Sequence, residues 1–432
     1  MRNIPGDCRY MTLVASEKSL ALGIFFLPLM TLTAPTGYSY PAVILLLAAL
    51  TQHTFLPGVE KHRHHLSFPA KLIISSLLLY AAFWIGDAAV RGEGLRGFDR
   101  PSRFIIAAFC LVAVSRARIN AEWFWAGLSF GSIGAGAIAL WQWAIGGVAR
   151  VSGFAPTNKF GLIAITMGLM CLSGLIWASN SSYSRKRKLL TAGLLIFGSC
   201  LGLTAAMLSG SRGAWIALIP STLVYLLVIP RVLKVVYSFS LIAVLALFLT
   251  LLALILPTDD SVNRLKNASS QLNTYLEGNF TEGPVGYRLD MWKGAILLFN
   301  ERPYIGWGEL GYASRMQDLE NNGALQKGTA DYAHAHNDWF NVLAKKGLTG
   351  GVVLLSVYVV PLFFFIQIAI RAVKGNALDT FTLALATSGI VLVLSFISGG
   401  VAQVPFGRNI GIMFYGFMMA SLVGLLSHQR SP

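Results

Sequence analysis

Apolar runs of about twenty residues recur along nearly the whole chain, and shorter polar stretches separate them. A helix of that length crosses a hydrocarbon layer of roughly 30 Å, whereas a transmembrane β-strand needs a shorter, alternating segment. The pattern therefore predicts an all-α polytopic membrane protein with about twelve transmembrane helices. The predicted spans are 19–34, 39–56, 71–90, 103–117, 121–146, 159–179, 188–208, 213–230, 233–256, 348–370, 379–398 and 410–427.

The boundary between the seventh and eighth predicted spans lies at the sequence SGSRG, from Ser209 to Gly213. Glycine and serine favour turns, and the apolar stretch 188–230 is long enough to cross a bilayer twice. We therefore predict two spans joined by a turn, with a single kinked span as the alternative.

Hydrophobic residues make up 55% of the 432 residues and charged residues only 12%, which excludes an ordinary soluble domain. The net charge of +15 does not indicate nucleic-acid binding, because Lys and Arg lie between apolar spans and form no basic domain. They are better interpreted as topology signals and contacts to anionic membrane lipids. The basic loops that we assign to the cytoplasm contain Lys61, Arg63 and Lys71, then Arg116 and Arg118, Arg185 to Lys188, Arg231 and Lys234, and Arg371 and Lys374.

This orientation places both termini in the cytoplasm and the long polar segment 257–335 outside. In a bacterium with an outer membrane, that segment is a periplasmic loop between the ninth and tenth predicted helices of an inner-membrane protein. We expect a single membrane domain, 1–432, whose loop carries part of the active site. Within the loop, apolar residues recur at helical spacing over 287–300, so we predict an amphipathic helix on the membrane face; these residues are Leu289, Trp292, Ile296 and Phe299.

The loop closes on the sequence AHAHNDWFNVLAKKGLTG, from Ala333 to Gly350. Asn337 or Asp338 can cap a short helix, and Gly347 can end it. His336 then lies at the positive end of that helix, where imidazolium is disfavoured. We expect a neutral ring that can accept a proton; a polar side chain at a membrane boundary is the alternative role.

Two arginines are predicted on the same outer side as His336. Arg212 lies in the SGSRG turn, and Arg288 lies near the start of the amphipathic helix. Guanidinium groups form paired, charge-assisted hydrogen bonds to phosphate oxygens, so the two could grip a diphosphate. A snorkelling anchor for Arg212 and a solvated loop charge for Arg288 are the alternatives.

We expect no metal and no cofactor. Asp87 and Asp259–Asp260 lack the spaced acidic partners of a divalent-cation site, and the histidines of 62–65 lie in a loop assigned to the cytoplasm. No phosphate-binding loop, dinucleotide turn or nucleophile elbow occurs in the sequence.

The spacing of His336, Asn337, Gly347 and Gly350 resembles the signature of the O-antigen ligases, and the large outer loop and the SRG-containing turn resemble that family as well. The resemblance implies a glycosyltransferase-C-like fold. It also implies an enzyme that transfers O-antigen from undecaprenyl diphosphate to a sugar hydroxyl of lipid A core, the final step of lipopolysaccharide assembly.

The resemblance further implies that His336 is the catalytic base and that Arg212 and Arg288 bind the donor diphosphate, in an inverting, metal-independent reaction. Apart from the resemblance, Asp331, His334 and Asn337 flank the candidate base and could bind or orient the acceptor; packing roles are the alternative. O-antigen polymerases and protein O-oligosaccharyltransferases share the turn and the loop, so both remain alternatives. A membrane transporter is the alternative from another class; it would carry polar residues near the middle of its spans, where this chain has few.

Overall fold

The computed structural model describes residues 6–55, 66–179, 183–228, 269–275, 277, 280, 283–375 and 378–427. In these ranges the secondary structure is helical throughout and contains no strand, so the predicted all-α class is confirmed. The predicted span 233–256, the pair Asp259–Asp260 and the histidines of 62–65 lie outside the described residues.

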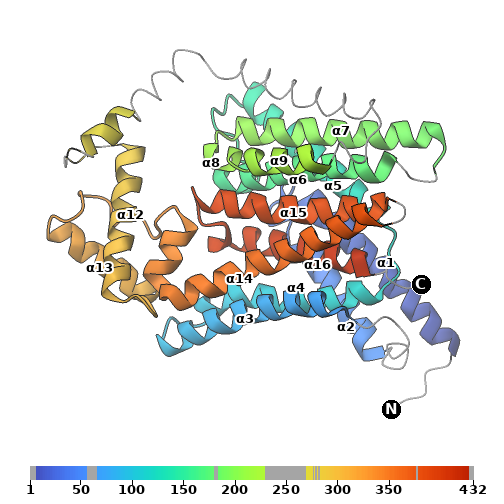
Figure 1. The fold of residues 1–432 in the computed structure, drawn as a ribbon, viewed down its shortest axis with the longest axis horizontal. Helices are drawn as coiled ribbons and strands as arrows, with labels where there is room; N and C mark the ends of the chain where they lie inside the picture. The colour runs from blue at the N-terminus through green and yellow to red at the C-terminus, as the bar shows by residue number, and fades with distance from the viewer. Residues whose placement is uncertain are drawn as a thin grey trace.

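The helices form a bundle of roughly parallel and antiparallel segments, with two helices set across one end (Figure 1). In chain order they are α1 (Gly6–Thr31), α2 (Ser39–Phe55), α3 (Phe68–Val90), α4 (Arg96–Arg116), α5 (Glu122–Ala144), α6 (Thr157–Ser179), α7 (Arg185–Leu208), α8 (Arg212–Trp215), α9 (Leu218–Val228), α12 (Pro284–Glu301), α13 (Gly308–Asn321), α14 (Asp338–Lys374), α15 (Thr380–Gly400), the 3₁₀ turn η3 (Pro405–Gly407) and α16 (Asn409–Ser427).

Eight of the described helices are long and apolar enough to cross a membrane, so the chain is a polytopic membrane protein. Two further predicted spans are helical but lie outside this set, because α2 has only 17 residues and the first turns of α4 are charged. The predicted break after Leu208 is confirmed, although the apolar stretch beyond it divides again into α8 and α9. The number of spans in the described residues is therefore below the predicted twelve.

The centre of the bundle is formed by α6, α15 and α16, whose side chains are almost completely buried. Close helix contacts depend on small residues, as is usual between helices in a membrane. A Cβ atom on Gly202 of α7 would lie 2.9 Å from the Cα atom of Gly168 of α6. These two helices thus approach each other at backbone contact.

The connections 32–38, 91–95, 145–156, 209–211 and 401–408 lie at the same end of the bundle as residues 283–337, and we call it the outer end. Contacts join them across the chain: Arg91 donates to the carbonyl of Ile305 at 2.7 Å, and Asn337 donates to that of Val401 at 3.1 Å. This arrangement agrees with the alternation of basic and nearly uncharged loops in the sequence.

The helices α12 and α13 lie across the outer end and share a small core (Figure 1). Met291 and Leu298 of α12 pack with Met316 of α13. The predicted helix over 287–300 is thus present. Ala295 packs in the core beside Met291 and Leu298, whereas Ile296 is 44% exposed, so the contact of its predicted apolar face with the membrane stays a prediction.

Candidate active site

The segment that contains His336 is held by a capped helix start and a glycine kink. The side-chain oxygen of Asn337 accepts hydrogen bonds from the backbone of Trp339 and Phe340 at 3.0 and 3.2 Å, which confirms the predicted cap. Gly347 has φ 65° and ψ −164°, so the helix that begins at Asp338 is interrupted there. The predicted short helix after His336 is therefore correct, and α14 continues beyond the kink as a membrane span.

His336 has a left-handed backbone conformation with φ 51°, which is uncommon outside glycine and indicates local strain. Its backbone N–H donates to Nδ1 of His334 at 3.3 Å, and the centroids of the two rings are 4.3 Å apart. The Nδ1 atom of His336 is buried without a hydrogen-bond partner in the described part of the chain. The Nδ1 atom is therefore closed to solvent.

The electrostatic surroundings of His336 favour the neutral ring. Burial lowers the pKa of His336, and the positive charges of Arg288 and Lys159 lower it further. The direction is the one expected from the sequence, but the cause is different: desolvation and two cations act on the ring, rather than the helix end alone.

Arg288 links His336 to two further guanidinium groups. Its charge acts on His336, while partial burial lowers the pKa of Arg288 and the charges of Arg150 and Arg212 lower it further. Arg150 donates to the carbonyl of Ser209 at 3.5 Å, beside the turn that contains Arg212. The three side chains remain at least partly exposed and available to an anion. Arg150 was not predicted from the sequence.

The loop Val401–Val404, after α15, joins the arginine turn to the histidine segment. A Cβ atom on Gly213 would lie 2.3 Å from the Cβ of Ala402, so the turn approaches this loop as closely as a glycine allows. On the other side, Asn337 Nδ2 donates to the carbonyl of Val401 at 3.1 Å. Segments about 125 residues apart in the chain thus meet on one short loop.

Lys159 is a second residue that the sequence reasoning missed. Its ammonium group is buried and donates to Gln403 Oε1 at 3.3 Å and to the carbonyl of Val404. Arg150 and Lys159 both lie on the outer side, although Lys and Arg usually concentrate in cytoplasmic loops. Their position against this bias was the feature of the sequence that could have identified them as candidate site residues.

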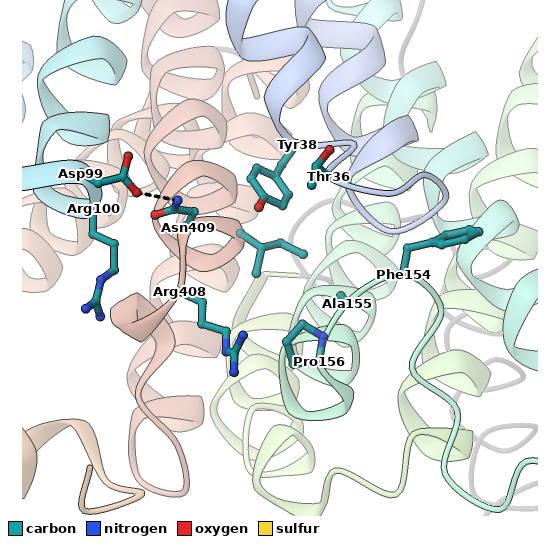
Figure 2. A pocket seen from close by; sticks show the side chains of 10 residues that line it. Thr36, Tyr38, Asp99, Arg100, Phe154, Ala155, Pro156, Arg408 and Asn409 are labelled. Carbon is teal, nitrogen blue, oxygen red and sulfur yellow. Dashed lines mark hydrogen bonds between the residues drawn. The ribbon is translucent and has the colours of Figure 1, made fainter. Parts of the chain in front are cut away.

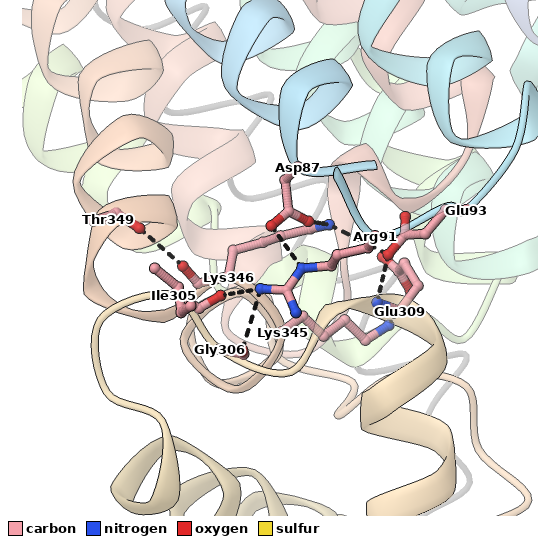
Figure 3. A network of polar contacts seen from close by, with 9 residues as sticks. All are labelled: Asp87, Arg91, Glu93, Ile305, Gly306, Glu309, Lys345, Lys346 and Thr349. Carbon is pink, nitrogen blue, oxygen red and sulfur yellow. Dashed lines mark hydrogen bonds and ion pairs between the residues drawn. The ribbon is translucent and has the colours of Figure 1, made fainter. Parts of the chain in front are cut away.

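An ion-pair network holds the outer loop against the bundle (Figure 3). Lys345 contacts Glu309 of α13 at 2.5 Å and donates to the carbonyl of Ala333 at 2.8 Å. Lys346 pairs with Asp87 of α3, which also pairs with Arg91 at 2.8 Å. Asp87, weighed above as a metal ligand, thus has two cationic partners here. In the described ranges, no group of three or more His, Cys, Asp and Glu side chains is placed to hold a metal ion.

The lysines of this network keep the carboxyl group of Glu309 ionised despite its burial. Burial raises the pKa of Glu309, but Lys345 and Lys346 lower it more, so the pKa ends below its usual value. Trp292 Nε1 of α12 also donates to the carbonyl of Ala335 at 3.0 Å. The residues immediately before His336 are therefore fastened both to α12 and to α14.

The other three predicted site residues, His334, Asn337 and Asp331, have different surroundings. His334 packs on His336, and burial lowers the pKa of His334 to about 4, with further contributions from His336, Lys345 and Lys159. Asn337 serves as the helix cap and as the link to Val401. Asp331 is exposed near the start of the segment. The structure thus brings Arg212, Arg288 and His336 to one end of the bundle, with His334 and Asn337 beside them.

Comparison with known proteins gives two findings. Residues 197–355 match the family model described as O-antigen ligase, and this range contains Arg212, Arg288 and His336. An uncharacterized protein of Haemophilus influenzae is 26% identical over 400 residues, which cover 92% of this chain and 95% of the relative. The family match therefore supports membership of the O-antigen ligase/polymerase superfamily.

Proposed function

We propose that this protein is an O-antigen ligase of the bacterial inner membrane, with its active site on the periplasmic side. In this proposal it transfers O-antigen from undecaprenyl diphosphate to a sugar hydroxyl of lipid A core. The observation that carries the proposal is that Arg288, at the end of a membrane bundle, lies near a histidine with a lowered pKa and near two further arginines, Arg150 and Arg212. Lipid-anchored donor and acceptor can both reach such a site from the bilayer.

His336 is the general base of the proposed reaction. Its lowered pKa keeps the ring neutral near pH 7, so Nε2 can take the proton from the acceptor hydroxyl. The hydroxyl oxygen forms a bond to the anomeric carbon as the bond from that carbon to the donor phosphate oxygen breaks. The electron pair of the broken bond leaves with undecaprenyl diphosphate, and one displacement inverts the anomeric centre.

The arginines supply the positive charge for the departing diphosphate. Arg212 and Arg288 carry planar groups that match phosphate oxygens, and their charge is most valuable in the transition state, where the leaving group becomes more negative. Arg150 adds a third charge from the neighbouring loop. Three guanidinium groups can neutralise a diphosphate, so we propose that the reaction needs no metal.

Transfer by the purified protein tests the proposal. The full chain is reconstituted in liposomes with undecaprenyl-diphosphate-linked O-antigen and lipid A core, with and without EDTA. We expect glycan on lipid A core in both conditions, and none with His336→Ala. Chain growth on undecaprenyl diphosphate would instead identify a polymerase, and loss of turnover in EDTA with recovery on adding magnesium would contradict metal independence.

Deletion of the gene in the native host gives an independent test. A ligase deletion should leave lipid A core without O-antigen and should accumulate the lipid-linked glycan. Single repeat units still attached to lipid A core would identify a polymerase. Unchanged lipopolysaccharide with altered glycoproteins would identify a protein-glycosylating enzyme.

A further inference from the structure

A separate cavity of about 340 Å³ opens at the outer end, between four segments of the bundle (Figure 2). Its walls come from the connection between α1 and α2, the first turns of α4, the segment before α6 and the start of α16. The lining residues are Thr36, Tyr38, Asp99, Arg100, Phe154, Ala155, Pro156, Arg408, Asn409 and Ile410. None of these residues belongs to the arginine group described above.

The cavity is positively charged. Arg100 and Arg408 extend in the same direction from the two helix ends that carry them (Figure 2). Arg100 donates to the carbonyl of Gly407 at 3.0 Å, which holds it beside Arg408. Asp99, the acidic residue of the lining, is already engaged: Arg103 forms an ion pair with it, and Asn409 donates to it at 2.8 Å.

Two charges on the outer side require an explanation, because the usual bias of Lys and Arg is toward the cytoplasm. Arg408 is exposed, and its guanidinium group can donate hydrogen bonds to an anion in the cavity. The charge of Arg100 also acts on Glu309, but Glu309 is paired with Lys345 at 2.5 Å. Both guanidinium groups therefore remain available to a ligand.

Lys159, which is held by the loop Val401–Val404, lies electrostatically between the cavity and the candidate base. Lys159 contacts Gln403 and Val404 of that loop, and its charge acts on His336. The charge of Arg408, four residues after Val404, acts on Lys159 in turn. Arg408 of the cavity is thus linked to the base through Lys159, whereas the predicted donor arginines come from other segments, Arg212 from the turn at Ser209–Gly213 and Arg288 from α12.

We propose that this cavity is an acceptor subsite, which binds an anionic oxygen group, phosphate or carboxylate, on a sugar of the lipid-anchored acceptor. The assignment rests on the proposed glycosyl transfer. Guanidinium groups recognise both anions through paired hydrogen bonds. A volume of about 340 Å³ is near the lower end for small-molecule sites, so it suits one charged sugar rather than a long glycan. Binding there would hold the acceptor at the outer end of the bundle, where His336 also lies.

The test compares substrate dependence in Arg408→Ala, Arg408→Lys and Arg100→Ala. The matched control is Arg96→Ala, which removes the same charge one turn earlier in α4 and outside the cavity. Full-length protein in phosphatidylcholine liposomes is assayed with lipid A core and lipid-linked O-antigen, each varied in turn. We expect Arg408→Ala and Arg100→Ala to raise KM for lipid A core about tenfold or more, with a smaller rise for Arg408→Lys. KM for the donor should stay within about twofold, and the control should match the parent.

Other results would overturn the subsite. A raised KM for the donor alone would assign the cavity to the donor, and unchanged values for both substrates would remove the cavity from the reaction. If the variants lose activity only in liposomes that contain phosphatidylglycerol, the cavity binds a membrane headgroup instead. Folding of each variant is checked by size-exclusion chromatography, and direct binding of labelled lipid A core replaces turnover for any variant that is folded but inactive.

Phosphatase-treated lipid A core distinguishes the two anions. If treatment raises the parent's KM to that of Arg408→Ala, the bound group is a phosphate; if the difference between them persists, it is a carboxylate. Failure of the proposed function is a separate result, because the parent would then transfer no glycan to lipid A core under any condition. Binding of labelled lipid A core to parent and variants still tests the cavity in that case.

Discussion

Asn337 and Val401 are joined by a hydrogen bond of 3.1 Å from the side-chain amide to the backbone carbonyl, while the oxygen of the same side chain caps α14. One side chain therefore begins the helix and fastens it to the loop after α15. Asn337→Asp should keep the cap and lose the donor, whereas Asn337→Ala should lose both. Loss of a cap costs about 1 kcal/mol, so we expect the Ala variant to be the less stable.

Thermal unfolding and turnover of these two variants check the prediction. We expect Asn337→Asp to unfold near the parent temperature but to turn over more slowly, because the His336 segment is no longer held to Val401. Equal turnover in Asn337→Asp and the parent would show that the link has no role in activity.

The contact between Gly213 and Ala402 gives a reciprocal test. Gly213→Ala should reduce activity, because the new Cβ would lie 2.3 Å from the Cβ of Ala402 and would push the Arg212 turn away from the loop. Ala402→Gly removes that obstacle, so the double variant should recover a large part of the lost activity. Gly193→Ala in α7 is the control, since a Cβ there meets nothing within 4 Å. Additive losses in the double variant would argue against the steric explanation.

Substitution of the proposed base should affect the kinetics differently from substitution of the two proposed diphosphate-binding arginines. His336→Ala should lower kcat by about 10²–10⁴-fold and leave donor binding nearly intact, because it removes proton transfer alone. Arg212→Lys and Arg288→Lys keep a charge but lose the planar fork, so they should weaken both donor binding and kcat. Donor affinity is measured with labelled lipid-linked glycan beside turnover. Near-normal turnover in His336→Ala, or unchanged donor binding in the arginine variants, would reverse these assignments.

The pKa of His336 predicts the acid limb of the pH profile. A base with a lowered pKa loses activity only when the pH falls through that value, so the limb should lie below pH 6.5, the usual histidine value. Arg288→Gln removes a positive charge near the ring, which raises the pKa of His336 and should move the limb to higher pH. Arg288→Lys keeps the charge and should leave the limb in place despite a lower rate. Relative kcat/KM from pH 4.5 to 8 is measured for the parent and for both variants. An acid limb at the same pH in Arg288→Gln and the parent would show that the limb does not report the titration of His336.

The orientation is testable by cysteine labelling in a variant without the four native cysteines. Asn322→Cys is in the exposed end of α13 and should react with an impermeant maleimide in intact spheroplasts. Lys186→Cys is exposed at the start of α7, at the opposite end of the bundle, and should react only after the membrane is opened. The reverse pattern would place the candidate site in the cytoplasm.

Features set by neighbouring residues were predictable from the sequence. The cap at Asn337 and the break at Gly347 depend on short-range backbone chemistry, and both are present. The end of α7 before Ser209 follows from a local glycine and serine turn. The helical class follows from the length of the apolar runs, because a bilayer demands that every backbone polar group be satisfied within the span.

Features set by long-range contacts were not predictable in the same way. Lys159 depends on Gln403 and Val404, more than 240 residues later in the chain, and Arg150 depends on Ser209, 59 residues later. The second face of α12, on which Met291, Ala295 and Leu298 pack against Met316 of α13, depends on a partner helix that its own apolar spacing does not reveal. Two predicted spans are missing from the set of long apolar helices, because α2 has only 17 residues and α4 begins with charged turns. The length of the apolar runs alone does not show where these helices begin and end.

The position of Val401 near the end of the chain has a consequence for biogenesis. Arg212, Arg288 and His336 are all synthesised and can be inserted before the ribosome reaches this residue. A nascent chain that ends at Gly400 has the three predicted side chains but lacks both the carbonyl that holds Asn337 and the loop against which Gly213 packs. The centre is therefore completed only when α15 has been inserted and its outer end has closed over the earlier segments, which keeps an unfinished chain from presenting an assembled site.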